Sequence, residues 1–200
     1  MQPDTRPALH PVRAIPAVGK NAMQRSAMRV LGALLLATMF WSPAWAGEAW
    51  RQALPDATEV GGGELSWLGF RIYRATLWAG ERPFDPARSF ALQLTYRRSI
   101  SRQRLVQTSM DEIRRLSAAP IPSDTLARWQ AMLETAMVDV NAGDQLTGVY
   151  LPARGMRLYD AQGLLGELDD PALARAFFDI WLNPASRDQG LRQRLLGMQP

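Results

Sequence analysis

The side chains that most often carry out acid-base, nucleophilic or metal chemistry are nearly absent from this sequence. Its one histidine is His10, its one lysine is Lys20, and it contains no cysteine. From residue 47 onward the chain therefore cannot form a Ser-His-Asp triad, a thiolate nucleophile, a Schiff base or an ordinary zinc site. Carboxylates, arginines, tyrosines and hydroxyls remain for polar chemistry, and we expect no cofactor and no metal.

Residues 23–46 have the order of a secretory leader. Arg25 and Arg29 precede an apolar run at residues 30–40, and the segment SPAWA at residues 42–46 supplies a small-x-small cleavage site before Gly47. The apolar run is shorter than the roughly 20 residues that a membrane-spanning helix needs. A cleaved signal peptide is therefore favoured over a retained membrane anchor.

The leader defines the predicted domain organisation. Residues 1–22 are proline-rich and lack apolar periodicity, so we expect a disordered extension or a mis-assigned start, with Met23 or Met28 as the true first residue. Residues 47–200 then form one exported domain that works in the periplasm or is secreted. No membrane span is expected after cleavage.

The positive charge of the chain belongs mainly to the leader. Of the 23 basic residues five lie within residues 1–46, and of the 19 acidic residues one does, which leaves 18 of each sign. A neutral domain has no electrostatic attraction for nucleic acid, so we expect no nucleic-acid partner. Whether a protein partner exists is left open.

Alternation of apolar and polar residues predicts strands at residues 65–79, interrupted by a turn at Gly69, and at residues 90–96. Residues 61–63, a glycine triplet, are predicted to form a turn that leads into the first strand. Three further short strands are expected between residues 145 and 165, joined by short turns into an antiparallel meander.

Helical periodicity follows each set of strands. One helix is expected after Ser101 and ends before Pro120, and a second is capped by Ser123 or Asp124. Asp170 caps a third helix, and a fourth covers residues 187–196. Strands and helices that follow one another in blocks predict an α+β domain, with an antiparallel sheet covered on one face by helices.

Three segments together resemble the bacterial chalcone isomerase-like family. Residues 177–184 (FFDIWLNP), followed by residues 191–197 (LRQRLLG), are similar to its closing helices, and residues 69–78 (GFRIYRATLW) are similar to an early strand. Gly143-Asp144, followed by Tyr150, Pro152 and Gly155, resembles a hairpin of that family. The segments occur in the family order and span most of residues 47–200.

The resemblance implies an open-faced sandwich with a cleft between sheet and helices. In catalytic plant members the cleft holds a flavonoid, and an arginine near the first strand steadies its phenolate. In non-catalytic members the cleft takes a fatty acid, whose carboxylate is held by arginine and tyrosine. Residues 61–64 offer three glycines and an acid where that arginine is expected, and residues 99–101 lack the tyrosine expected after the third strand.

Four residues are candidates for ligand binding. Tyr73 matches a position where the family has a polar hydroxyl, and its alternative role is a strand tyrosine with a buried ring. Arg71, Arg74 and Arg97 are candidate substitute anchors for an anion, or else solvated surface residues. No catalytic residue is assigned.

Three functions compete on this basis. The first is an exported protein that binds a fatty acid or similar apolar acid without converting it. The second is an isomerase, an intramolecular lyase for a chalcone-like enone, which requires a buried arginine beside a hydroxyl donor. The third is a structural or interaction module, which predicts that side chains fill the space between sheet and helices.

Overall fold

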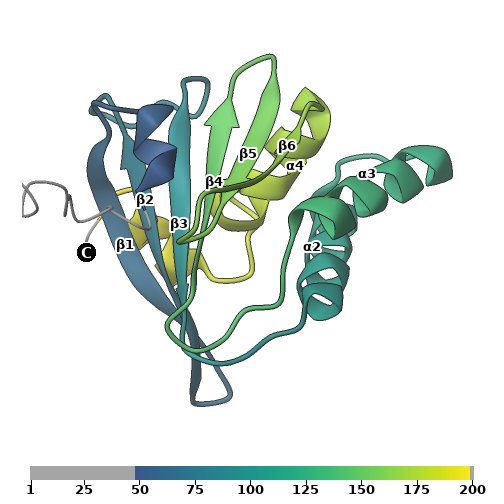
Figure 1. The fold of residues 1–200 in the computed structure, drawn as a ribbon, viewed down its shortest axis with the longest axis horizontal. Helices are drawn as coiled ribbons and strands as arrows, with labels where there is room; N and C mark the ends of the chain where they lie inside the picture. The colour runs from purple at the N-terminus through teal and green to yellow at the C-terminus, as the bar shows by residue number, and fades with distance from the viewer. Residues whose placement is uncertain (1–47, 199–200) are drawn as a thin grey trace, which may run out of the picture. The chain divides into compact units, whose positions relative to one another are not determined.

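The sheet is a meander of six antiparallel strands in the order β1-β2-β3-β4-β5-β6 (Figure 1). The structure is a computed structural model that describes residues 48–198, and the predicted leader and cleavage site lie outside the described residues. The strands are β1 (Thr58–Trp67), β2 (Phe70–Ala79), β3 (Phe90–Tyr96), β4 (Gln145–Leu151), β5 (Gly155–Tyr159) and β6 (Leu164–Leu168).

The helices gather on one side of this sheet, as the sequence predicts. Helix α5 contacts β1, α4 contacts β4 and β5, α3 contacts β6, and α2 packs on α4. In Figure 1, α4 and α5 lie behind the sheet, whereas α2 and α3 extend past its β6 side. Within residues 48–198, every helix is too short or too polar to cross a bilayer. The helices are α2 (Arg102–Leu116), α3 (Ser123–Ala136), α4 (Pro171–Leu182) and α5 (Gln189–Leu195), with a 3-10 turn, η1 (Ala49–Gln52), before the sheet.

Side-chain capping begins three of these helices. The hydroxyl of Ser101 accepts from the N–H of Arg104 at 3.3 Å, and Asp188 accepts from the N–H of Leu191 at 2.7 Å. Asp170 accepts from the N–H groups of two residues in the first turn of α4. These oxygens satisfy backbone donors that have no partner inside the helix. Ser123 is already helical, and the position before it is Pro122 rather than a capping serine or aspartate.

A stack of aromatic rings joins α4 to the middle of the sheet. Phe178 lies edge-on to Phe90 of β3 and to Tyr150 of β4, with ring centroids 4.9 and 5.8 Å apart. All three side chains are buried in the main core, which contains residues from all four α-helices. Burial of such large rings contributes strongly to the stability of a domain that has no disulfide.

The opposite face of the sheet carries a second, smaller core that the sequence did not predict. Trp50 of η1 packs against Trp78 of β2 with ring centroids 5.6 Å apart. The guanidinium of Arg51 lies over both indoles, 4.6 and 4.5 Å from their ring centroids. A cation above an indole face is attracted by the ring quadrupole. The first described turn of the chain is therefore held to the sheet by a Trp-Arg-Trp contact.

The glycine triplet lies inside β1, so its prediction as a turn was wrong. Gly61, Gly62 and Gly63 pair with β2 in an unbroken series. At two of them α5 lies close to the strand: a Cβ at Gly61 would fall on the carbonyl oxygen of Arg194, and one at Gly63 would meet the side chain of the same residue. The glycines thus permit a helix to approach the edge strand at backbone distance.

Substitution of Gly61 by alanine should destabilise the fold, because the methyl group displaces α5 from β1. Overpacking of this kind costs about 1–3 kcal/mol in free energy of unfolding. Gly80→Ala is the matched control, since nothing lies within 4 Å of a Cβ at that position. Urea titration should give a lower midpoint for Gly61→Ala and an unchanged one for Gly80→Ala; equal midpoints would contradict the packing argument.

Candidate functional site

A cleft of about 1390 Å³ lies between the sheet and the helices α2, α4 and α5. Its inner wall is apolar and comes from alternate residues of neighbouring strands together with two rings of α4. The residues that form this wall are Leu92, Leu94, Leu146, Leu158, Phe177 and Phe178. The space between the layers is therefore open, which does not favour a module whose core is filled by side chains.

Two tyrosines supply phenolic hydroxyl groups on the sheet side of the cleft. Tyr73 and Tyr96 are paired across β2 and β3, and their rings meet edge to face with centroids 6.0 Å apart. The indole Nε1–H of Trp181 on α4 donates to the Tyr73 hydroxyl oxygen at 2.8 Å. Because this oxygen accepts from Trp181, the proton of Tyr73 remains available to a ligand acceptor.

Both tyrosines are held in their protonated form. Burial raises the pKa of Tyr73, and the hydrogen bond from Trp181 lowers it by less. Burial also raises the pKa of Tyr96, and the neighbouring Tyr73 adds to that effect. A phenol that stays protonated across the physiological range serves as a hydrogen-bond donor and not as a base.

Charged residues line the mouth of the cleft. Its basic members are Arg98, Arg104 and Arg187, all exposed. Glu112 is buried in α2 and forms ion pairs with Arg187 and with Arg115, the latter at 2.7 Å. Desolvation raises the pKa of Glu112, but the hydrogen bonds from the two arginines outweigh it and hold the pKa below its ordinary value. The ion pair with Glu112 therefore holds the guanidinium group of Arg187 beside the cleft.

The four predicted candidates fall in different places. Tyr73 lines the cleft, with its ring against Tyr96. Arg71 and Arg74 are exposed on β2, and Arg97 is exposed after β3, where it pairs with Glu64 at 2.9 Å. Among the described residues that line the cleft, none of these three arginines is found.

Sequence reasoning missed Tyr96, Arg98 and Arg104 as cleft residues. The resemblance implies a tyrosine just after the third strand, and Tyr96 is the last residue of β3. The signal was present in the alternation of residues 90–96, which sets Tyr96 on the same face as three buried apolar residues. Its pairing with Tyr73 depends on strand register, which the local sequence pattern does not contain.

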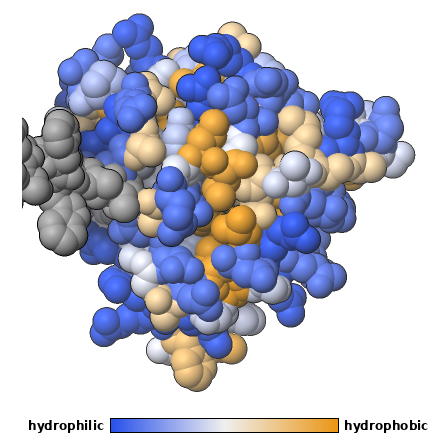
Figure 2. Space-filling view, in the orientation of Figure 1, coloured by the Kyte–Doolittle hydropathy of each residue, from blue (hydrophilic) through white to orange (hydrophobic). Residues whose placement is uncertain are grey.

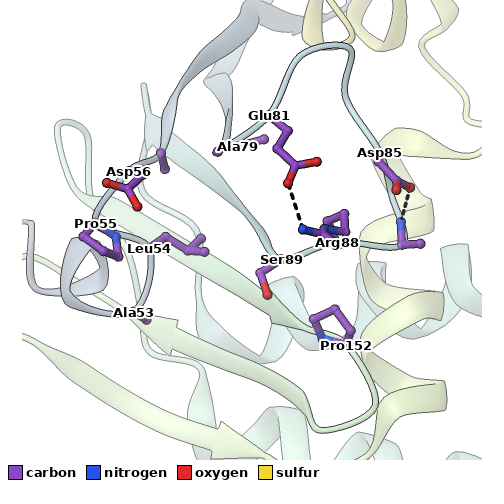
Figure 3. A pocket seen from close by; sticks show the side chains of 13 residues that line it. Ala53, Leu54, Pro55, Asp56, Ala79, Glu81, Asp85, Arg88, Ser89 and Pro152 are labelled. Carbon is purple, nitrogen blue, oxygen red and sulfur yellow. Dashed lines mark hydrogen bonds and ion pairs between the residues drawn. The ribbon is translucent and has the colours of Figure 1, made fainter.

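A second pocket, of about 500 Å³, lies beside η1 and is shown in Figure 3. Three of its four charged groups have partners: Arg88 donates to Glu81 at 2.8 Å, and Asp85 accepts from the N–H of Ala87 at 2.8 Å, whereas Asp56 forms no side-chain hydrogen bond within the described residues. All of them are exposed. Within residues 48–198 no cluster of side chains is suited to hold a metal ion. The larger cleft is therefore the candidate functional site.

The fold and cleft define the class of protein as an open-faced α+β sandwich with a ligand-sized cavity between its layers. The family described as chalcone isomerase-like matches residues 52–197, and the chain belongs to this family. Among solved structures, a fatty-acid binding protein of Arabidopsis thaliana is similar, with a TM-score of 0.54 and 11% identity over 71% of this chain and 87% of that chain. At this identity the similarity concerns the fold. No curated protein matches the chain.

Replacement of Glu112 by glutamine should lower stability at neutral pH by about 2 kcal/mol, because two charge-assisted hydrogen bonds weaken at a buried site. The folded pKa lies below the ordinary value of 4.5, so the wild-type advantage is present above that value and is lost as pH falls through the folded pKa. Unfolding in urea from pH 7 to pH 3 measures this difference.

Asp111→Asn on the same helix is the control for this experiment. Its carboxylate forms an exposed pair with Arg114 at 3.0 Å, and such pairs contribute less than about 1 kcal/mol. If the two variants lose equal stability at pH 7, or if the Glu112→Gln deficit persists unchanged at pH 3, the role assigned to the buried carboxylate is wrong.

Proposed function

We propose that this protein binds a fatty acid or a similar apolar acid in the cleft and does not convert it. The observation that carries the proposal is the combination of an apolar wall of leucines and phenylalanines with two protonated tyrosines and arginines at the mouth. Ligand pockets usually measure about 300–1000 Å³. The cleft, at about 1390 Å³, has room for a long acyl chain.

The hydroxyls of Tyr73 and Tyr96 are the proposed donors to the ligand carboxylate. Tyr96 ends β3 and Arg98 follows two residues later, and both line the cleft. An arginine remains charged at every physiological pH and can meet a carboxylate with two parallel N–H donors. In this arrangement the head group lies toward the mouth, and the acyl chain runs along the leucines of β3 to β5.

Binding without conversion is supported by the side chains of the cleft. The isomerase hypothesis needs a buried arginine beside a hydroxyl donor, whereas the arginines among the described cleft residues are exposed. In a solvated position an arginine stabilises a developing oxyanion much less than in a dry site. Trp181 also occupies one lone pair of the Tyr73 hydroxyl and fixes its direction.

Tyr73→Phe and Tyr96→Phe should each weaken binding of palmitate about ten-fold, since each removes a hydrogen bond to a charged group. Tyr159→Phe is the matched control, because Tyr159 is buried in the small core on the other face of the sheet. Calorimetric titration with palmitate gives the affinities. Titration with hexadecanol, which has the same chain length but no carboxylate, measures how much the carboxylate contributes to binding. The proposal fails if palmitate does not bind, and the anchor assignment fails if Tyr159→Phe weakens binding as much.

Export completes the proposed function and rests on the sequence of residues 23–46. We expect the exported chain to begin at Gly47 and to be recovered from the periplasm or medium of the producing bacterium. Intact-mass measurement of the protein from these fractions checks this expectation. Trp45→Arg, which leaves both small residues of the cleavage site in place, is a control, and Ala46→Arg should block processing. A chain that retains residues 23–46 would contradict the cleaved leader.

A further inference from the structure

The turn between β1 and β2 exposes three large apolar side chains in four consecutive residues. Trp67, Leu68 and Phe70 are 70%, 76% and 65% exposed, and they account for three of the five exposed large hydrophobic residues in the described part of the chain. The hairpin projects from the lower end of the molecule in Figure 1, and the corresponding surface in Figure 2 is coloured toward the hydrophobic end of the scale. Concentrated apolar exposure of this kind marks an interaction site.

The backbone of the turn does not explain the choice of leucine. Trp67 pairs with Phe70, so Leu68 and Gly69 form a two-residue loop, and both have positive φ, +49° and +81°. Glycine or asparagine is preferred at the first of these positions, because a branched side chain is strained in the left-handed region. Leu68 is thus unfavourable for the turn and is not buried, which indicates a role outside the fold.

Arginines surround the base of the same hairpin. Arg71, Arg74 and Arg98 are exposed and form no ion pair within the described residues. The guanidinium of Arg98 lies 5.9 Å from the centroid of the Phe70 ring. The nearby carboxylate of Glu64 is already paired with Arg97. The tip is therefore apolar at its apex and positively charged at its base.

We propose that this hairpin tip docks the protein on an anionic phospholipid bilayer, with Trp67, Leu68 and Phe70 in the interfacial region and the arginines on lipid phosphates. Tryptophan and arginine are the residues that such an interface favours. The tip is a single two-residue turn and offers much less than the roughly 1,000 Å² that a stable protein interface buries. A bilayer needs no complementary pocket, so a narrow apolar tip suffices.

Docking at the tip would bring the cleft to the membrane. Trp67 and Arg98 line the cleft as well as the tip, so the mouth faces the same surface. Uptake of an apolar acid directly from the bilayer follows from this placement, and that consequence rests on the proposed function. The docking itself does not require that the cleft take a ligand.

A site-specific label tests the proposal on the full chain, which has no cysteine of its own. Leu68→Cys and the control Leu164→Cys, at an exposed leucine of β6, are labelled with an environment-sensitive nitrobenzoxadiazole. With vesicles of phosphatidylglycerol and phosphatidylcholine, we expect a blue shift and quenching by brominated acyl chains at position 68 only. Because the Leu164→Cys protein contains the same residues 1–46, contacts made by those residues affect both labelled proteins, and only a response confined to position 68 supports docking at the tip.

Charge variants test the role of the arginines. Arg71→Gln should weaken vesicle binding, measured from the label at position 68, roughly five-fold. Arg175→Gln, at an exposed position of α4, should have no effect. Equal insertion into pure phosphatidylcholine would overturn the anionic requirement. If the emission of the label at position 68 does not change when vesicles are added, membrane docking is overturned. If its emission instead shifts with protein concentration in buffer alone, membrane docking is also overturned, and contact between two copies of the chain is favoured.

Palmitate titration of the same labelled proteins in vesicle-free buffer separates the two proposals. Leu68 does not line the cleft, so palmitate should bind Leu68→Cys as it binds the wild type. Palmitate binding without vesicle docking defeats only the membrane proposal. Vesicle docking without palmitate binding would contradict only the proposed function.

Discussion

The cleft in this fold depends on firm contacts between the sheet and the helices, both at the edges of the sheet and in its middle. Both edge strands have a glycine beneath a helix. A Cβ at Gly61 of β1 would strike the backbone of α5, and one at Gly166 of β6 would lie 3.0 Å from the Cβ of Ala136 in α3. Between these edges Phe178 of α4 packs on Phe90 and Tyr150 of the sheet, and Trp181 donates a hydrogen bond to Tyr73. Because close packing is the default in protein interiors, such a cavity requires rigid supports on both sides.

The electrostatic state of the cleft follows from the same arrangement. Tyr73 and Tyr96 lie where burial disfavours the phenolate, so their hydroxyls remain donors. Glu112 is buried as well, yet two arginines hold it as a carboxylate. The site therefore combines neutral donors on the sheet with one buried carboxylate that is paired with two arginines. The carboxylate of an apolar acid would add one negative charge. The arginines at the mouth can balance this charge while their guanidinium groups remain in solvent.

Local patterns in the sequence were sufficient for most of the secondary structure. Period-two alternation located β2 and β3, and the acceptor side chains Ser101 and Asp170 marked helix starts because they satisfy free backbone donors. The prediction began strand β1 too late, because a run of glycines shows no alternation of apolar and polar side chains. The helix that packs on Gly61, α5, lies over a hundred residues further along the chain. The small core around Trp50 was missed for a similar reason: its partner Trp78 lies on the face predicted to be free of helices.

The candidate site was less predictable than the fold because its geometry depends on long-range pairing. Tyr73 could be chosen from the family resemblance, but its neighbour Tyr96 follows from register, and the Glu112 pair with Arg187 joins residues 75 positions apart. The arginine that the resemblance implies on the first strand is replaced by glycines, and the basic groups at the cleft come instead from Arg98, Arg104 and Arg187. The similarity to a solved structure at 11% identity concerns the fold, so it does not fix which elements carry the charged side chains of the cleft. Because basic groups reach the cleft from a loop and a helix as well as from just past the end of a strand, the residue at one position of the first strand is a weak guide to the site.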